Sequence, residues 1–274
     1  MRLTENYRRP AVAGRFYPAE PDRLAQSIRE FLEPPQEQID ALGVVVPHAG
    51  YMYSGHVAGA VYARILVPQR NIVLCPNHTG MGTPLSIMKQ GVWQTPLGDM
   101  RIDEELCAAL MTADAYLEDD ISAHRFEHAL EVQLPFLQHI GGASTRFVPI
   151  TIGTSNLDRL EELGRAIAKV LQEVDRGALI IASSDMNHYE SDAITRVKDR
   201  KAIERMLAMD PPGLYQVVRQ EKISMCGYGP AVAMITAAKL LGATRAELVK
   251  YATSGEVSLD FDNVVGYAGL TVSG

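Results

Sequence analysis

Short apolar runs alternate with longer amphipathic segments along this chain of 274 residues. The apolar runs are rich in valine and isoleucine and have the length of buried strands. They lie at 43–46, 71–76, 146–152 and 178–185. Helical periodicity predicts helices at 21–32, 54–66, 104–111, 128–139, 157–174 and 229–242. This alternation predicts an α/β fold with a mostly parallel sheet covered by helices on both faces.

Local signals refine the ends of these elements. Ser54 and Asn156 each stand at the start of a helical pattern, where their side chains are expected to cap the first turn. Glycine and proline interrupt the segment 85–102, which favours a pair of antiparallel strands there. The segments 246–252 and 264–272 close the chain. Because we find no repeat and no long linker, we predict one domain over residues 1–274.

Composition and charge narrow the class of protein. The chain is 47% hydrophobic, and its net charge of -7 comes without any basic block. A nucleic-acid partner is therefore not expected. No run reaches transmembrane length, so no membrane role is expected, and three widely spaced cysteines do not form a disulfide framework. We expect a soluble protein of the reducing cytoplasm.

Three of the predicted strands end in polar residues that can carry chemistry. PHAGY places His48 after one strand, PNHTG places His78 after another, and SSDMNHY places Asp185 and His188 after a third. A single histidine after a strand is usually an ordinary hydrogen-bonded residue. However, ligands of open α/β sheets bind at the carboxyl ends of the strands. We therefore expect these side chains to meet at one edge of the sheet.

Cys226, in SMCGYGP, is a fourth candidate because it lies in a glycine-rich turn just before a predicted helix. A helix N-terminus lowers the pKa of a thiol, and the thiolate is the form that binds metal. We interpret Cys75 and Cys107 as inert core residues. His139 is expected to support the end of its helix, and for His56 the core, the surface and the surroundings of the site all remain open.

The segment HRFEHALEVQLPF brings two histidines and two glutamates to helical spacing. The order of the residues is E-H-x-x-E, which is not the H-E-x-x-H pattern of zinc proteases. A solvated helix face is the simple alternative. We select Glu127 and His128, together with Tyr51 and Tyr53, as candidates for the pocket wall or for residues that support the ligands.

The motifs taken together resemble one protein family. They are AVAGRFYP, PHAGYMYSG, PNHTG, EHALEVQLPF, SSDMNHY and MCGYGP, in this order. On these motifs the chain is similar, from Arg9 to Gly269, to the Memo family, whose prokaryotic members are called AmmeMemoRadiSam system protein B.

The resemblance implies a fold and a site. The Memo family is similar to the class III extradiol dioxygenases, which have a three-layer α/β/α sandwich and non-haem iron in a cleft. By motif, His48, His78 and Cys226 correspond to the metal ligands, and Asp185 and His188 to neighbouring catalytic residues. Animal members bind phosphorylated peptides, and copper and iron are associated with them. The prokaryotic name implies AMMECR-type and radical-SAM partner proteins.

One residue type departs from the dioxygenase pattern. Those enzymes use two histidines and a carboxylate, whereas the third ligand here would be a cysteine. A thiolate favours copper(I), zinc or thiolate-bound iron, and a set of three ligands leaves a fourth position open. Three functions remain: a redox-active iron or copper protein acting on an unknown small molecule, a metal-assisted hydrolase, and a non-catalytic module that binds a peptide or a partner.

Overall fold

The centre of the molecule is a parallel sheet formed by the apolar runs of the sequence. The computed structural model describes residues 7–34, 37–175 and 177–274. Five parallel strands lie side by side in the order β6 (Gly98–Ile102), β8 (Arg146–Ile152), β3 (Arg70–Pro76), β9 (Leu179–Ser183) and β2 (Gly43–Val46). The side chains of β2 and β9 are buried throughout, as continuous apolar strands covered on both faces require.

Antiparallel strands extend this parallel centre on both sides. On one side, β12 (Val264–Ser273) pairs with β2, and both β11 (Arg245–Thr253) and β10 (His188–Glu190) pair with β12. On the other side lie β5 (Val92–Thr95), antiparallel to β6, and β1 (Tyr7–Arg8). The predicted antiparallel pair at 85–102 is β5 and β6. A third strand of that segment, β4 (Leu85–Ile87), pairs with β8 and with β7 (Glu118–Asp119).

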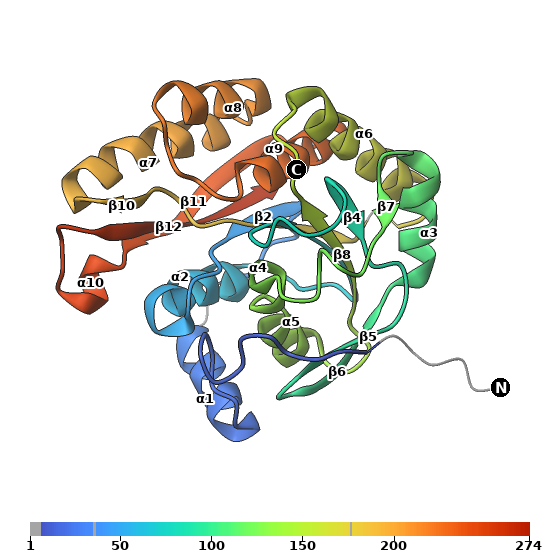
Figure 1. Ribbon diagram of the computed structural model, residues 1–274, viewed down its shortest axis with the longest axis horizontal. Helices are drawn as coiled ribbons and strands as arrows, with labels where there is room; N and C mark the ends of the chain where they lie inside the picture. Colours follow the sequence, from blue (N-terminus) through green and yellow to red (C-terminus); the bar gives the residue numbers. More distant parts are fainter. Residues whose placement is uncertain (1–6, 35–36, 176) are drawn as a thin grey trace.

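Helices cover both faces of the sheet, so the predicted three-layer α/β/α arrangement is confirmed (Figure 1). One face carries α3 (Glu104–Ala113), α6 (Leu157–Glu173), α7 (Asp192–Leu207), α8 (Pro211–Gln220) and α9 (Tyr228–Leu240). The other carries α1 (Pro21–Phe31), α2 (Tyr51–Arg64), α4 (His128–Glu131) and α5 (Leu134–Gly141). The short α10 (Gly255–Ser258) lies between β11 and β12 along the chain.

Two of the predicted helix boundaries are wrong. Helix α2 begins at Tyr51 with Gly50 as its N-cap, and the Ser54 hydroxyl donates to the Ala49 carbonyl instead of capping the helix. The predicted helix at 128–139 is broken into α4 and α5, and α5 restarts with a proline in its first turn, a position that does not need a backbone N–H. The cap at Asn156 is confirmed, because its side chain accepts from the Arg159 N–H at 3.2 Å.

The prediction of a single domain over 1–274 includes residues 1–6, 35–36 and 176, which lie outside the described residues, and it stays a prediction. Among the described helices, none combines the length and the hydrophobicity that a membrane span requires.

One buried carboxyl group fastens α7 to the antiparallel strands. Asp199 is fully buried; its Oδ1 accepts from the Asn187 N–H at 2.8 Å and its Oδ2 from the Tyr251 hydroxyl at 2.7 Å. The backbone of β12 passes so close that a Cβ on Gly266 would lie 1.8 Å from Oδ2. Burial raises the pKa of Asp199 from 3.8 to about 7, against the opposing effect of these two hydrogen bonds.

This raised pKa predicts a dependence of stability on pH. The unfolded chain releases the Asp199 proton near pH 4, whereas the folded protein retains it until about pH 7. The stabilisation is therefore complete below about pH 4 and is lost as pH rises to 7, by about 3–4 kcal/mol in the free energy of unfolding. Urea unfolding at several pH values in this range gives the free energy of unfolding as a function of pH. We expect this free energy to change less with pH in Asp199→Asn than in the wild type. The exposed Asp22→Asn is the control, and an unchanged dependence on pH in Asp199→Asn would contradict the assignment.

Candidate metal centre

The structure brings His48, His78 and Cys226 together although they are far apart in the sequence. One ligand atom from each of the three lies within 4.8 Å of the others. The Cys226 Sγ is 3.2 Å from the His48 Nε2, and the His48 and His78 rings meet edge to face with their centroids 5.2 Å apart. Donors bound to one metal ion lie about 3–4 Å from one another, so this spacing is close to that of a coordination sphere.

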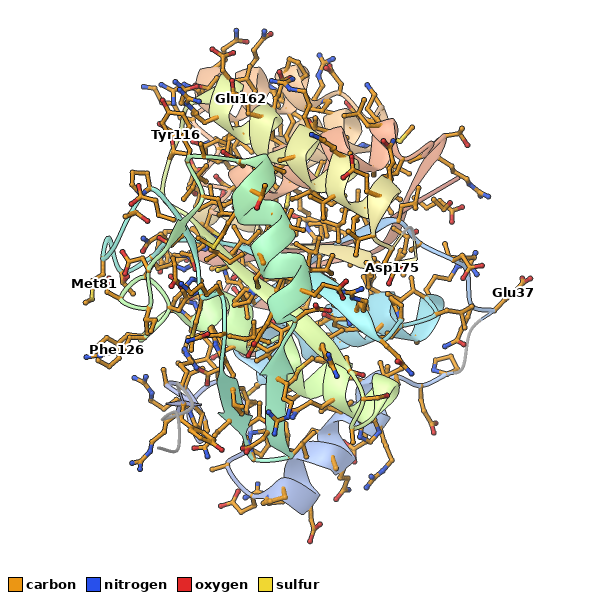
Figure 2. The ribbon with its side chains drawn as sticks, turned by 90° about the vertical axis from the view of Figure 1, so that its right-hand side faces the viewer. Glu37, Met81, Tyr116, Phe126, Glu162 and Asp175 are labelled. Carbon is orange, nitrogen blue, oxygen red and sulfur yellow. The ribbon has the colours of Figure 1, made fainter. Side chains whose placement is uncertain are left out.

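Sheet topology explains this convergence. His48 follows β2 and His78 follows β3, and both strands run parallel to β9, which lies between them. Their carboxyl ends therefore reach the same edge. Cys226 enters from the turn that precedes α9. Met81 and Phe126, close in sequence to His78 and Glu127, project from the same side of the molecule (Figure 2).

His48 is buried and neutral. The residue is 2% exposed. Burial keeps the pKa of His48 well below 6.5, and the neighbouring His78 and His128 lower it further. The neutral imidazole is the form that binds metal. Its Nδ1 lies 3.0 Å from the Ser183 hydroxyl, and its backbone N–H donates to Asp185 Oδ1 at 2.7 Å. The buried serine, which the sequence analysis did not select, thus holds the ring.

Glu127 holds His78 in the same manner. The carboxylate accepts from the His78 ring Nδ1 at 2.9 Å and from the His78 backbone N–H at 2.6 Å. Burial alone would raise the pKa of Glu127, but the contacts with His78 and the Ala129 N–H outweigh it and lower the pKa to about 2. Burial opposes the protonation of His78, yet the bond to Glu127 raises the pKa of His78 overall. A carboxylate at Nδ1 leaves Nε2 as the donor atom that faces the site.

A second group of residues, His78, Glu127 and His128, also has the spacing of a metal site. The His128 ring stacks on His78 with centroids 4.7 Å apart, and its Nδ1 is 3.5 Å from Glu127 Oε1. That oxygen already accepts from the His78 ring and from the Ala129 N–H. Because metal binding would have to displace these bonds, the geometry fits Glu127 as a support for His78 better than as a ligand.

The pKa of Cys226 differs from the sequence expectation. Burial, and next the Asp185 carboxyl, raise the pKa of its thiol well above 9, so the expected lowering at the start of α9 is wrong. The helix has Gly227 as its N-cap, but desolvation outweighs any effect of its N-terminus. The thiol lies within hydrogen-bond distance of the His48 Nε2, at 3.2 Å.

Asp185 and His188 flank the three candidate ligands. Asp185 is 5% exposed, and burial raises its pKa against the opposing bond from the His48 N–H. Asp185 accepts from the His48 backbone through Oδ1, and its other oxygen, Oδ2, lies 3.9 Å from the His48 Nε2. The carboxylate that contacts a histidine ring is thus Glu127, whereas Asp185 contacts the backbone of His48. The His188 Nδ1 lies 3.0 Å from the Ser224 carbonyl, to which it donates, and the His188 backbone N–H donates to the Ser224 hydroxyl at 2.7 Å.

The two tyrosines selected from the sequence have contacts away from the ligand atoms. Tyr51 is 4% exposed, its hydroxyl donates to the Val132 carbonyl at 2.7 Å, and its ring contacts Phe136 at 5.1 Å. Tyr53 packs against the small apolar cluster that includes Tyr267. Their contacts are those of packing residues. Cys75 and Cys107 are fully buried, as expected, and His56 lies near Lys250.

A buried ion pair anchors the segment that supplies Glu127. Glu131 pairs with Arg8, and both side chains are almost fully buried. The Arg8 guanidinium also donates to the Glu127 carbonyl at 2.7 Å and lies 4.1 Å above the Trp93 ring, while Glu131 accepts from the Tyr17 hydroxyl at 2.6 Å. The solvated helix face considered for this segment is therefore wrong. Spacing alone did not reveal the partner, because Arg8 lies in another part of the sequence.

The donor set fits a transition metal. Two imidazoles, each held at Nδ1, and one thiol point nitrogen and sulfur atoms into one small space. Nitrogen and sulfur donors suit zinc, copper and iron, whereas magnesium and calcium require oxygen. The described residues thus contain a group that could hold a metal ion.

Known sequences show which proteins resemble this chain. Residues 8–271 match the family described as Memo-like protein. A MEMO1 family protein of Methanopyrus kandleri is 45% identical over 96% of this chain and 98% of its own length. A MEMO1 family protein of Methanothermobacter thermautotrophicus is 42% identical over 96% and 99%, and one of Methanosarcina barkeri is 43% identical over 97% and 99%.

The Arg8–Glu131 pair predicts a large effect on stability. Glu131→Gln would leave the Arg8 charge buried and uncompensated, and we expect the free energy of unfolding to fall by about 3–5 kcal/mol. Glu162→Gln is the matched control, because its pair with Arg159 is solvent-accessible at both side chains and should be worth less than about 1 kcal/mol. Chemical denaturation measures both variants. Equal losses in the two variants would contradict the role of the buried pair.

Proposed function

The chain belongs to the Memo-like protein family, and from this premise we propose that it binds a transition metal ion through His48, His78 and Cys226. The observation that carries the proposal is the convergence of these two imidazoles and one thiol at the carboxyl edge of the sheet. Each histidine has its Nδ1 engaged by a neighbouring side chain, so the Nε2 atoms are available as donors.

We further propose that the bound metal is iron or copper and that the centre oxidises a small molecule. When bound, such an ion supplies one-electron redox chemistry, with dioxygen taking up the electrons that the substrate loses. A soft thiolate beside two imidazoles favours copper(I) or thiolate-bound iron, although zinc also accepts this set. The side chain of His78 is 33% exposed, which gives a substrate access to the centre.

Asp185 and His188 have distinct roles in this proposal. Asp185 fixes the peptide that carries His48 through the backbone N–H. His188 has its Nδ1 occupied by the Ser224 carbonyl, so Nε2 is left to exchange a proton with a substrate. Loss of the His188 imidazole is therefore expected to impair turnover more than metal binding.

The metal assignment predicts which variants lose the ion. Protein purified under reducing conditions should contain iron or copper in stoichiometric amount, and His48→Ala and Cys226→Ser should lose most of it because each removes a donor. Cys107→Ala is the matched control, since Cys107 is a free cysteine of the buried core that lies outside the cluster. Elemental analysis of folded protein, checked by circular dichroism, measures the metal. Wild-type protein that contains no transition metal would contradict the proposal.

The redox assignment is tested separately with the loaded protein. We expect its consumption of dioxygen to change when a small-molecule substrate is added, and His188→Ala to reduce that response while it retains the metal. An oxygen electrode and metal analysis on the same sample give both values. Zinc together with hydrolysis of esters or amides would instead support the metal-assisted hydrolase. Peptide binding that survives His48→Ala without any turnover would support the binding module.

A further inference from the structure

A series of buried hydrogen bonds, called the relay below, leads from Tyr62 through Gln133 and Ser183 to the candidate ligand His48. We propose that Gln133 and Ser183 are positioning residues that hold His48 in the tautomer protonated at Nδ1. Its Nε2 then faces the metal centre as a bare donor. That Nε2 serves a metal ion rests on the proposed function. The tautomer itself follows from the count of donors and acceptors in the relay.

The orientation of the Gln133 amide is fixed by a backbone carbonyl. One amide atom lies 3.0 Å from the Pro47 oxygen, which can only accept, so this atom must be the NH₂ group. The amide oxygen then faces the Tyr62 hydroxyl at 3.0 Å and accepts from it. The second hydrogen of the NH₂ group is directed to the Ser183 hydroxyl, 2.9 Å away. Ser183 therefore accepts from Gln133.

The single hydroxyl hydrogen of Ser183 is already committed. Its oxygen lies 2.6 Å from the Ala129 carbonyl, which again can only accept, and this is the shortest of its three contacts. The hydrogen therefore goes to Ala129. Only an oxygen lone pair remains for His48 Nδ1, at 3.0 Å, so the imidazole must be the donor.

The consequence for His48 is a neutral ring with its hydrogen on Nδ1. His48 is 2% exposed, and a charged ring without an ionic partner within hydrogen-bond distance would be costly at this depth. Nε2 therefore carries a lone pair, and this atom lies 3.2 Å from the Cys226 sulfur. The other tautomer would direct an N–H at the site and would leave Nδ1 facing the oxygen lone pairs of Ser183. Ser183 and Gln133 are both almost completely buried, so leaving such a contact unsatisfied would be costly.

The relay residues come from separate parts of the fold. Ser183 is the last residue of β9, Gln133 is the N-cap of α5, and the Pro47 carbonyl immediately precedes His48. Three separate elements are thus joined by the relay. This is the kind of support that fixes the orientation of metal-binding histidines, and its loss typically weakens metal affinity about 10–100-fold.

The tautomer is tested first in metal-free wild-type protein. Nitrogen NMR of ¹⁵N-histidine-labelled protein, with the His48 signals assigned by their loss in His48→Ala, distinguishes protonated from bare ring nitrogens. We expect His48 protonated at Nδ1 and bare at Nε2. A His48 ring protonated mainly at Nε2 would overturn the inference, and this measurement needs no variant of the relay to fold.

The relay is then tested with Ser183→Ala and with Ser86→Ala as the matched control, because Ser86 is a buried strand serine whose hydroxyl bonds to Thr83. In Ser183→Ala we expect a mixture of His48 tautomers and about 10–100-fold weaker cobalt(II) binding in anaerobic titrations. Gln133→Leu should change both readouts in the same direction, since it frees the Ser183 hydroxyl to rotate. Ser86→Ala should change neither.

The outcomes separate the relay from the proposed function. Wild-type tautomer and wild-type cobalt affinity in Ser183→Ala would overturn the relay while metal binding stands. A wild-type protein that binds no cobalt would count against the proposed function, and the NMR result would still decide the tautomer of His48.

Discussion

The cost of burying charge organises the candidate centre. Glu127 is the N-cap of the short helix α4 and Glu131 is its last residue, and both are fully buried. A buried carboxylate is tolerated only when it is paired and hydrogen-bonded. Glu131 is satisfied by Arg8 and Tyr17, and Glu127 by the ring and backbone of His78. Both the segment before α1 and the loop after β3 must therefore pack against α4. The contacts that satisfy these charges are the same contacts that orient a candidate ligand.

The same rule leaves the other two candidate ligands neutral. Burial lowers the pKa of His48 and raises that of Cys226, so both side chains are neutral, and they lie within hydrogen-bond distance of each other. The His78 ring is hydrogen-bonded to the charged carboxylate of Glu127, whereas the His48 ring is hydrogen-bonded to the neutral hydroxyl of Ser183. Their geometry depends on neutral groups: Ser183 at the ring of His48 and the peptide contact with Asp185. His78 is thus held by a charged partner, and His48 by hydrogen bonds with neutral groups.

The pattern of apolar residues predicted much of the fold, because burial of a strand or helix face leaves a period in the local sequence. The parallel centre and the helices on both faces were predicted in this way, and the Asn156 cap from its residue type at the start of a helix. The errors had two causes: a neighbouring residue that caps a helix earlier than expected, and a partner that is distant in the sequence. Ser54 lies inside α2 because Gly50 already caps that helix. Glu131 resembled a solvated position because its partner Arg8 is 123 residues away.

By itself the sequence determined the class of fold, the resemblance to the Memo family and the types of donor side chain at the strand ends. Only the tertiary structure decided which neighbours orient those donors. Ser183 is 135 residues from His48, Glu127 is 49 residues from His78, and Cys226 is 178 residues from His48. The tertiary structure also reversed the expected pKa of Cys226. The physical reason is that periodicity records whether a residue is buried, whereas hydrogen bonds and desolvation depend on which residues the folded sheet brings beside it.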